Sequence, residues 1–326
     1  MVLITIPGTR KENKTGANEG GLMDHCDLVA SDGQTVAGYA WDIEAPKAIV
    51  QIAHGMGEHA RRYDAVAQAL NKAGYAVFAN DHRGHGRTGR ARLGYMGGDG
   101  WNRTLADTFE FNRMLRARHA DVPLILLGHS MGSMLSQQYI TRYGYSIDAL
   151  ALSGSPGFKN RFGRLVPKLV ARFEAWRHGP DQSSELLQKL LFGGSNKAFD
   201  TPGATGFEWL SRDAAEVKKY VDDPECGFVL TTGSLVDLFA GAAMTQTPAC
   251  LAKIPLTLPI YVFAGTDDPV HGGQLDINRM LDAYRGCRLS RLEYRWYAGA
   301  RHEVFNETNR DEVIGDLVQW LDKVTA

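Results

Sequence analysis

The strongest constraint on the fold is the pentapeptide GHSMG at residues 128–132, which lies between an apolar run and a helix-forming run. Residues 124–127 are all Leu or Ile and predict a buried strand, whereas residues 131–143 predict a helix. The two glycines suit a strained strand-to-helix turn, because larger side chains beside such a turn would collide. The turn lifts the Ser130 hydroxyl clear of the backbone. The positive end of the helix then points at an oxygen that can become negative during a reaction.

Strand-like and helix-like runs alternate on both sides of this turn, which predicts the α/β class, with a mostly parallel sheet and helices on both faces. The 34–43 run alternates in polarity and is expected to be a half-exposed strand. The other expected strands are 48–53, 75–79, 123–127, 147–152, 258–264 and 292–297, and the expected helices are 63–72, 104–119, 131–143 and 311–324.

This alternation stops between residues 158 and 245. Apolar residues at helical spacing around 165–176 and 186–191 predict helices there instead. We therefore expect a core built from residues 23–157 and 246–326, which share one sheet, with 158–245 inserted as a helical lid over its carboxyl edge. Most apolar side chains of the lid are expected to pack on the core, and a minority to line a pocket.

Composition describes an ordinary globular protein. A length of 326 residues with 44% hydrophobic content supports a large core, and the formal net charge of −1 gives no reason to expect a nucleic-acid partner. The four cysteines show no metal-binding or paired spacing, as expected for reduced thiols in a cytoplasmic protein without a metal site. Residues 1–22 are expected to form a flexible N-terminal extension without signal-peptide features, and no run approaches the ~18 apolar residues of a membrane span.

A serine nucleophile requires a general base and a group that orients the base. Two loops after predicted strands supply candidates, one with the sequence GTDDPV and the other with GARHE. His302 would accept the serine proton, and an aspartate would hold its imidazole ring. Asp267 and Asp268 are adjacent, so spacing does not choose between them, although Pro269 restricts Asp268 to an extended backbone that favours it.

The oxyanion of an acyl-transfer intermediate needs two backbone N–H donors. Met131, directly after the serine, is the natural source of one. The other should come from the loop after an earlier strand, and HGMG at 54–57 follows the predicted strand 48–53. We therefore expect the N–H groups of Met56 and Met131 to form an oxyanion hole.

Together these motifs resemble the monoacylglycerol lipase and lysophospholipase-like branch of the α/β-hydrolases. The resemblance implies an α/β-hydrolase fold with a mostly parallel eight-stranded sheet and an inserted helical lid. It implies the triad Ser130, Asp268 and His302, which settles the choice of aspartate, and an oxyanion hole of Met56 and Met131. The matching segments, in order from about residue 25 to the C-terminus, are HGMGEH at 54–59 with Arg62 and Tyr63, DHRGHGRT at 81–88, GHSMG at 128–132, GTDD at 265–268 and HEVFNE at 302–307.

The resemblance further suggests that Glu58 and Arg62 lie near the polar headgroup end of the pocket. From the residues alone, a carboxylate at a helix start and a structural ion pair explain them equally well. The 81–88 motif has no evident catalytic task, and its Gly, His and Arg content predicts a hydrogen-bonded structural loop. Ser133 stands where many relatives have a glycine, which would change how closely the helix packs on the sheet but not the chemistry.

The motifs indicate a serine hydrolase that cleaves carboxylic esters through an acyl-enzyme and needs no cofactor. By resemblance, its substrates are monoacylglycerols, related single-chain lipids and short-to-medium-chain esters. Alternatives are a lysophospholipase or a broad carboxylesterase and, more distantly, a proline-type aminopeptidase. A noncatalytic hydrolase-fold receptor is disfavoured because the whole triad is retained. The apolar lid permits a transient membrane-surface contact, and nothing in the pattern specifies an oligomeric state.

Overall fold

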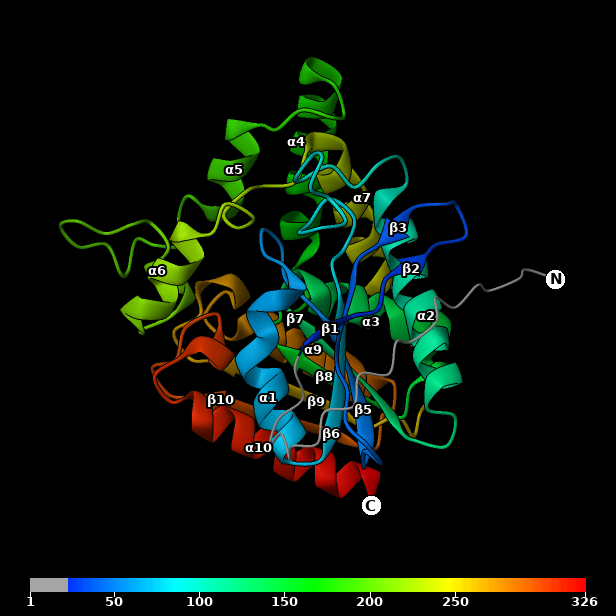
Figure 1. The fold of residues 1–326 in the computed structure, drawn as a ribbon. Coiled ribbons are helices and arrows are strands. Elements are labelled where there is room, and N and C mark those ends of the chain that lie inside the picture. The colour runs from blue at the N-terminus through cyan, green and yellow to red at the C-terminus, as the bar shows by residue number, and fades with distance from the viewer. Residues whose placement is uncertain (1–22) are drawn as a thin grey trace.

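The computed structural model describes residues 23–326, in which one eight-stranded sheet carries helices on both faces (Figure 1). The strands are β1 (Asp24–His25), β2 (Leu28–Val29), β3 (Thr35–Val36), β4 (Gly38–Trp41), β5 (Ala48–Ala53), β6 (Tyr75–Asn80), β7 (Leu124–His129), β8 (Ala149–Ser153), β9 (Ile260–Gly265) and β10 (Leu292–Tyr297). The main sheet has the order β1-β4-β6-β5-β7-β8-β9-β10, in which β4 pairs antiparallel with β1 and β6 and all other neighbours are parallel. The predicted fold class is therefore confirmed. The predicted extension at 1–22 lies outside the described residues.

Two apolar cores hold helices against the two faces of this sheet. The covering helices are α1 (Asp64–Lys72), α2 (Gly100–Arg118), α3 (Met131–Tyr143), α9 (Leu275–Gly286) and α10 (Arg310–Thr325). On one face α1 and α10 lie side by side and bury Leu70 and Leu317 (Figure 1). On the other face α2, α3 and α9 bury Leu105, Leu135 and Met280. Strands β5 to β9 are buried along their whole length, as expected for parallel strands covered on both sides.

The half-exposed strand predicted at 34–43 is wrong. The segment divides into β3, which pairs only with β2 in a separate two-stranded sheet, and β4, which joins the main sheet. All four residues of β4 are buried. The reason is that β4 lies between β1 and β6 rather than at an open edge, and Tyr39 and Trp41 pack into the core beneath α1.

Helices replace the strand–helix alternation between residues 158 and 245, as the spacing predicts. They are α4 (Arg161–His178), α5 (Glu185–Phe192), α6 (Ala214–Asp222) and α7 (Thr232–Thr245), followed by the short α8 (Pro248–Leu251). Helix α7 contacts α2 and α3 of the core, and α4 packs on α7. Figure 1 shows α4 and α5 at the end of the molecule farthest from α10. The division into core and lid, with its boundaries, stays a prediction.

The expectation that apolar residues of this insertion mostly pack on the core is wrong for α4 and α5. Helix α4 buries Ala171 and Glu174 on the face toward α7, and other faces carry large apolar side chains into solvent. Phe162 and Trp176 are the most exposed, at 74% and 80%. The exposed set is Phe162, Leu165, Val166, Leu169, Phe173 and Trp176 on α4, with Leu186 and Leu190 on α5. Among residues 23–326, no helix has the length and apolar character needed to cross a bilayer.

Candidate active site

Ser130 lies between β7 and α3 in a strained backbone conformation. Its φ and ψ angles are 51° and −115°, a region that side chains other than glycine rarely adopt. A Cβ atom at Gly128 would lie 2.5 Å from Ser136 Oγ, and one at Gly132 would overlap the carbonyl oxygen of Ala53. The glycines on both sides of Ser130 therefore permit the turn that the pentapeptide predicts.

The structure brings Ser130, His302 and Asp268 together at the carboxyl ends of β7, β10 and β9, which belong to the same parallel part of the sheet. His302 Nε2 lies 2.8 Å from Ser130 Oγ, and His302 Nδ1 lies 2.9 Å from Asp268 Oδ2. The other carboxylate oxygen of Asp268 accepts a hydrogen bond from the Val270 N–H at 2.8 Å. Asp268 and His302 follow β9 and β10 and are only 2% and 3% exposed. This chain of contacts places an oriented base against a hydroxyl group.

Burial and neighbouring charges shift the pKa values of Asp268 and His302 in opposite directions. Burial alone would raise the pKa of Asp268, but the adjacent His302 imidazole and the Val270 N–H outweigh it, and the pKa lies below its ordinary value. Burial would lower the pKa of His302, but Asp268, Glu303 and Glu58 raise it above its ordinary value. The nearby His129 contacts Ser153 Oγ rather than a carboxylate, and burial together with His302 outweighs the effect of the same three carboxylates and lowers its pKa to about 4. The site therefore favours a proton on His302 over one on His129.

The two expected oxyanion donors, Met56 and Met131, lie beside Ser130. Met131 begins α3, and Met56 lies in the connection between α1 and β5, the strand that pairs with β7. A Cβ atom at Gly55 would lie 3.3 Å from the Cβ of Ser130, so this loop approaches the serine closely. Within residues 23–326, neither the Met56 nor the Met131 N–H donates a hydrogen bond. Both groups are thus available to an oxygen held near Ser130.

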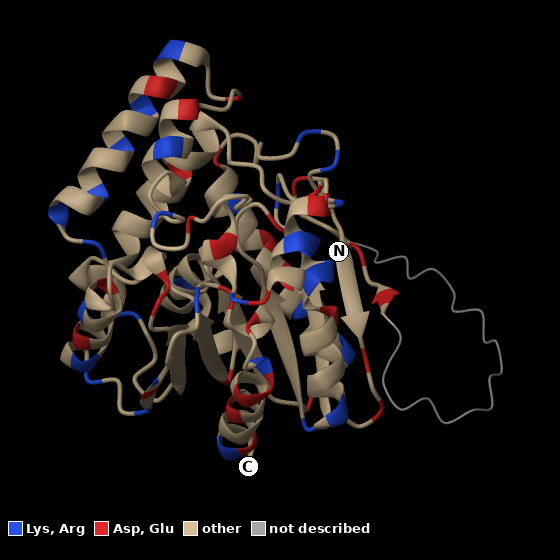
Figure 2. Ribbon diagram, turned by 90° about the vertical axis from the view of Figure 1, so that its left-hand side faces the viewer, with Lys and Arg blue, Asp and Glu red and all other residues tan. Residues whose placement is uncertain are grey.

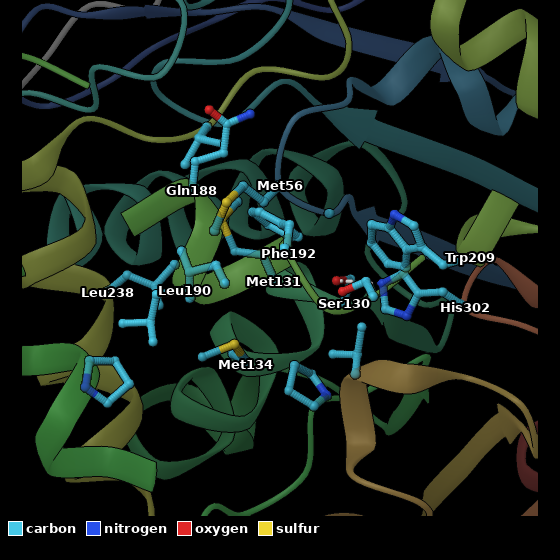
Figure 3. Close-up of a pocket in the computed structure, with 18 of the residues that line it drawn as sticks. Met56, Ser130, Met131, Met134, Gln188, Leu190, Phe192, Trp209, Leu238 and His302 are labelled. Atoms are coloured by element: carbon cyan, nitrogen blue, oxygen red, sulfur yellow. Dashed lines mark hydrogen bonds between the residues drawn. The ribbon is translucent and has the colours of Figure 1, made fainter. Parts of the chain in front are cut away.

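A cavity of about 780 Å³ opens beside Ser130 and is lined by both the core and the helical insertion. Figure 3 shows Ser130, His302 and Trp209 at one end and Leu190, Leu238 and Gln188 at the other. Thioether, aliphatic and aromatic side chains form much of the wall between the two ends, including Met56, Met131, Met134, Leu190, Phe192 and Leu238. The cavity can hold an elongated apolar group whose end reaches the serine.

Glu58 and Arg62 form an ion pair, and only Glu58 lines this cavity. The Arg62 guanidinium lies behind it and also binds Glu303, a residue that the sequence reading did not single out. Two aromatic residues of the insertion were also missed. The Trp209 ring lies 5.1 Å from the His302 ring, and the Tyr220 hydroxyl donates to the Gly57 carbonyl oxygen. Such contacts join segments far apart in sequence, so motif spacing does not reveal them.

The 81–88 motif forms the hydrogen-bonded loop that its composition predicts. The Asp81 carboxylate accepts bonds from the N–H groups of Ala60 and Arg87 and from the Tyr39 hydroxyl. Ser133, the departure from glycine in the elbow helix, donates its hydroxyl to the Ser130 carbonyl oxygen at 2.6 Å. Asp81 therefore ties its loop to Ala60 and to Tyr39 of β4, whereas Ser133 supports the turn that carries Ser130, and neither Asp81 nor Ser133 lines the cavity.

One group of described residues has the composition of a metal site: His59, Asp223 and Cys226 place their ligand atoms within 4.8 Å of one another. His59 Nε2 is already 2.9 Å from Asp223 Oδ2, and burial raises the pKa of the Cys226 thiol. The Arg62 cation, which acts on the same thiol, opposes a second positive charge there. These residues are explained by a hydrogen-bonded pair, and we assign no metal to them.

Comparison with known proteins links this geometry to a family. Residues 44–309 match the family described as "Serine aminopeptidase, S33". A monoacylglycerol lipase from Mycolicibacterium smegmatis is 31% identical, over 85% of this chain and 88% of its own length, and a monoglyceride lipase from Mus musculus is 29% identical over 90% and 89%. The crystal structure of a carboxyl esterase from Bacillus coagulans aligns with a TM-score of 0.84 at 25% identity and covers 93% of this chain and 99% of the esterase.

Proposed function

The chain belongs to the serine aminopeptidase S33 family of hydrolases and is an ester hydrolase of the monoglyceride lipase type, and on that premise we propose that Ser130 performs the reaction through an acyl-enzyme. One observation carries the proposal: Ser130 Oγ, His302 and Asp268 are linked by contacts of 2.8 and 2.9 Å on a strained turn beside an apolar cavity. Strain of this kind persists where the surrounding fold holds a functional group in place.

In this mechanism Asp268 binds the proton-bearing Nδ1 of His302, so that Nε2 accepts the Ser130 hydroxyl proton. The Ser130 oxygen then bonds to the ester carbonyl carbon, and the N–H groups of Met56 and Met131 hold the oxyanion. His302 returns the proton to the alcohol oxygen as the C–O bond breaks, which leaves the acyl group on Ser130. A water molecule, deprotonated by the same nitrogen, releases the acid and restores the hydroxyl.

We propose monoacylglycerols and short-to-medium-chain esters as substrates. The apolar wall of the cavity suits one acyl chain, and Glu58 lines the cavity as a polar group for an alcohol headgroup. Lysophospholipids are a second candidate, because Arg164 and Lys189 line the same cavity and would face a phosphate. A broad carboxylesterase would share the triad without selecting a headgroup.

Hydrolysis of a substrate panel tests this proposal. The panel runs from p-nitrophenyl acetate to long-chain esters, monoacylglycerols, diacylglycerols and lysophosphatidylcholine, with Ser130→Ala as the control. We expect preferential cleavage of monoacylglycerols and a loss of several orders of magnitude in Ser130→Ala, because triad members act as a unit. Wild-type activity in Ser130→Ala would refute the assignment. Turnover of short esters alone would reduce the function to a carboxylesterase, and inactivity on every ester would favour an aminopeptidase or a receptor.

We also propose that residues 158–245 act as a lid whose α4 makes a transient contact with a lipid surface. The exposed apolar side chains of α4 and α5 support this, because an interfacial helix buries its apolar face at the headgroup boundary. Basic residues are spaced along the length of α4 (Figure 2). They are Arg161, Arg164, Lys168, Arg172 and Arg177. Positive charge beside an apolar stripe is the pattern that binds anionic lipid headgroups.

Co-sedimentation with vesicles tests the surface contact. We expect the protein to bind phosphatidylcholine vesicles that contain phosphatidylglycerol, and the double variant Phe162→Ser/Trp176→Ser to bind less while it still cleaves p-nitrophenyl butyrate. Tyr145→Ser is a matched control, because Tyr145 is 75% exposed and lies outside the insertion. Equal binding by the double variant and the wild type would refute the contact.

A cytoplasmic location is proposed on the state of the cysteines. Cys26, Cys226, Cys250 and Cys287 are all free thiols in residues 23–326, as expected in a reducing compartment. Fractionation of cells that express the tagged full chain tests the location, and recovery outside the cytoplasm would contradict it.

A further inference from the structure

Arg62 links two buried carboxylates that belong to opposite sides of the candidate active site. Its Nη1 lies 2.7 Å from Glu58 Oε2 and 2.6 Å from Glu303 Oε1, and its Nη2 lies 2.7 Å from Glu303 Oε2. We propose that Glu58, Arg62 and Glu303 are positioning residues that hold the Met56 N–H and the His302 imidazole in their reactive alignment. The proposal rests on the ester-hydrolase mechanism above and concerns groups that do not touch the reacting atoms.

The Glu303 side of this network fixes the loop that carries His302. Glu303 follows His302 directly, is 6% exposed, and makes a two-pronged contact with Arg62. Its Oε2 also accepts a hydrogen bond from the Asn306 side chain, and its N–H donates to the Leu210 carbonyl oxygen. A two-pronged arginine–carboxylate contact restricts direction as well as distance, so the backbone beside His302 has little freedom.

The Glu58 side fixes the loop that carries Met56. Glu58 Oε1 accepts hydrogen bonds from the Gly55 N–H at 2.5 Å and from the Tyr63 hydroxyl at 2.9 Å. Because Gly55 immediately precedes Met56, this contact sets the orientation of the peptide on one side of the expected oxyanion donor. Glu58 is 3% exposed, so water competes little for the contact.

Tyr220 of α6 completes the network on the other side of Met56. Its hydroxyl donates to the Gly57 carbonyl oxygen at 2.9 Å, and the Gly227 N–H donates to the same oxygen at 2.9 Å. The Tyr220 ring lies 4.8 Å from the Arg62 guanidinium carbon. Both peptide neighbours of Met56 are therefore held, one by the core and one by the insertion, and Arg62 contacts both holders.

The network also affects the pKa of His302 through its charge, in addition to fixing the position of the imidazole. Two carboxylates and one guanidinium leave one negative charge beside the imidazole. The charged and titratable groups facing His302 are Asp268 after β9, Glu58 and Arg62 after β5, His129 on β7 and Glu303 on its own loop. Glu303 and Glu58 both act to keep the His302 proton bound. Removing one of these charges should make the base easier to deprotonate.

The kinetics of Glu303→Gln distinguish positioning from headgroup binding. We expect kcat to fall roughly ten-fold on both p-nitrophenyl butyrate and monobutyrin, with KM little changed, because misalignment affects every ester equally. We also expect the acid limb of kcat/KM to move to lower pH by roughly half a unit, because a negative charge near His302 is lost. A residue that only binds the glycerol headgroup would raise KM for monobutyrin and leave the nitrophenyl ester unaffected.

Two further variants keep the test decisive. Glu307→Gln is the matched control: it removes another buried carboxylate with an arginine partner, Arg212, from the same motif, and it should leave the acid limb unmoved. Tyr220→Phe deletes only the Tyr220 hydroxyl, which donates to the Gly57 carbonyl oxygen, and it should lower kcat on both esters without moving the acid limb. This variant provides a test if Glu303→Gln does not fold. An unmoved acid limb in Glu303→Gln with unchanged kcat on the nitrophenyl ester would overturn the proposal. Full activity of Ser130→Ala would instead overturn the ester-hydrolase mechanism itself.

Discussion

A group of buried histidines should make the protein sensitive to mild acid. His54, His82 and His85 lie beneath the loop that carries Met56, with ring centroids 4.1 to 6.2 Å apart, and His129 precedes the serine. The backbone N–H of His82 donates to His54 Nε2, so this ring nitrogen carries no proton. The His54 proton is therefore on Nδ1, which donates to the Gly55 carbonyl oxygen. His82 Nδ1 and His85 Nε2 have no hydrogen-bond partner among residues 23–326. A proton added there would be a buried charge without a partner.

The size of the effect follows from the pKa values. Burial lowers the pKa to about 3 for His82 and to about 4 for His85 and His129, and it lowers the pKa of His54 well below its ordinary value. The unfolded chain, with histidine pKa values of ~6.5, binds more protons below that pH, so stability is complete above pH 6.5 and is lost as pH falls toward 4. At pH 5 His82, His85 and His129 each cost about 2 kcal/mol, so the three cost about 6 kcal/mol, which is comparable with the whole stability of an ordinary domain, and His54 acts in the same direction. His302 opposes the trend, because its raised pKa lets the folded protein bind a proton earlier.

Thermal unfolding from pH 7.5 to pH 5 measures this loss. We expect the Tm to fall by more than about 10 °C across that range. His85→Gln should remove about a quarter of the pH dependence, because one of the four buried histidines is lost. A Tm that stays within two or three degrees would show that these histidines are not held neutral by burial, and the reasoning would be wrong.

Three other predictions follow from single contacts. Gly132→Ala should prevent stable folding, because the added Cβ would overlap the Ala53 carbonyl oxygen. Gly315→Ala should raise the free energy of unfolding by up to about 1 kcal/mol, because Gly315 lies in α10 with open space around it. Urea unfolding of both variants measures the difference. Asp268→Asn should fold normally and lose about four orders of magnitude in kcat because the His302 tautomer is no longer fixed; a loss below ten-fold in steady-state assays would contradict that role. Activity on p-nitrophenyl butyrate should fall as pH drops through the His302 pKa, and the acid limb should lie above pH ~6.5, higher than an unperturbed histidine implies; a flat pH–rate profile down to pH 5.5 would argue against His302 as the base.

Strands with continuous apolar runs were predictable, because parallel strands covered on both faces need no polar side. The runs at β5, β7 and β9 place these strands within two residues of the structure at each end. The short strands β1 and β2 have two residues each, too few for any periodicity, and were missed, and β3 was merged with β4 into one predicted strand. Helix α9 was also missed, although Ile277, Met280, Leu281 and Tyr284 follow helical spacing. The apolar spacing of α9 was sufficient to predict a helix. The burial of β4, by contrast, depends on the strands beside it, which no local sequence pattern specifies.

The candidate triad was predictable because acyl-transfer chemistry requires few residue types in one order at strand ends. The structure places His302 within hydrogen-bond distance of both Ser130 and Asp268, as their assigned roles require. Partners that act through these residues were not predictable. Arg62 meets Glu303 across 241 positions, and Trp209 reaches His302 from the insertion, so only the folded chain shows either contact. The exposure of α4 was misjudged for a related reason: helical spacing marks an apolar face but not what covers it.

The most direct test of the acyl-enzyme is the mass of the trapped intermediate. The wild-type protein is mixed with a p-nitrophenyl ester and quenched in acid, and the digested chain is searched for the acyl group by mass spectrometry. Our account predicts one acyl group, on the peptide that contains Ser130, with a burst of nitrophenol of one equivalent, and neither signal in Ser130→Ala. Acylation of another residue, or a burst that persists in Ser130→Ala, would contradict the account.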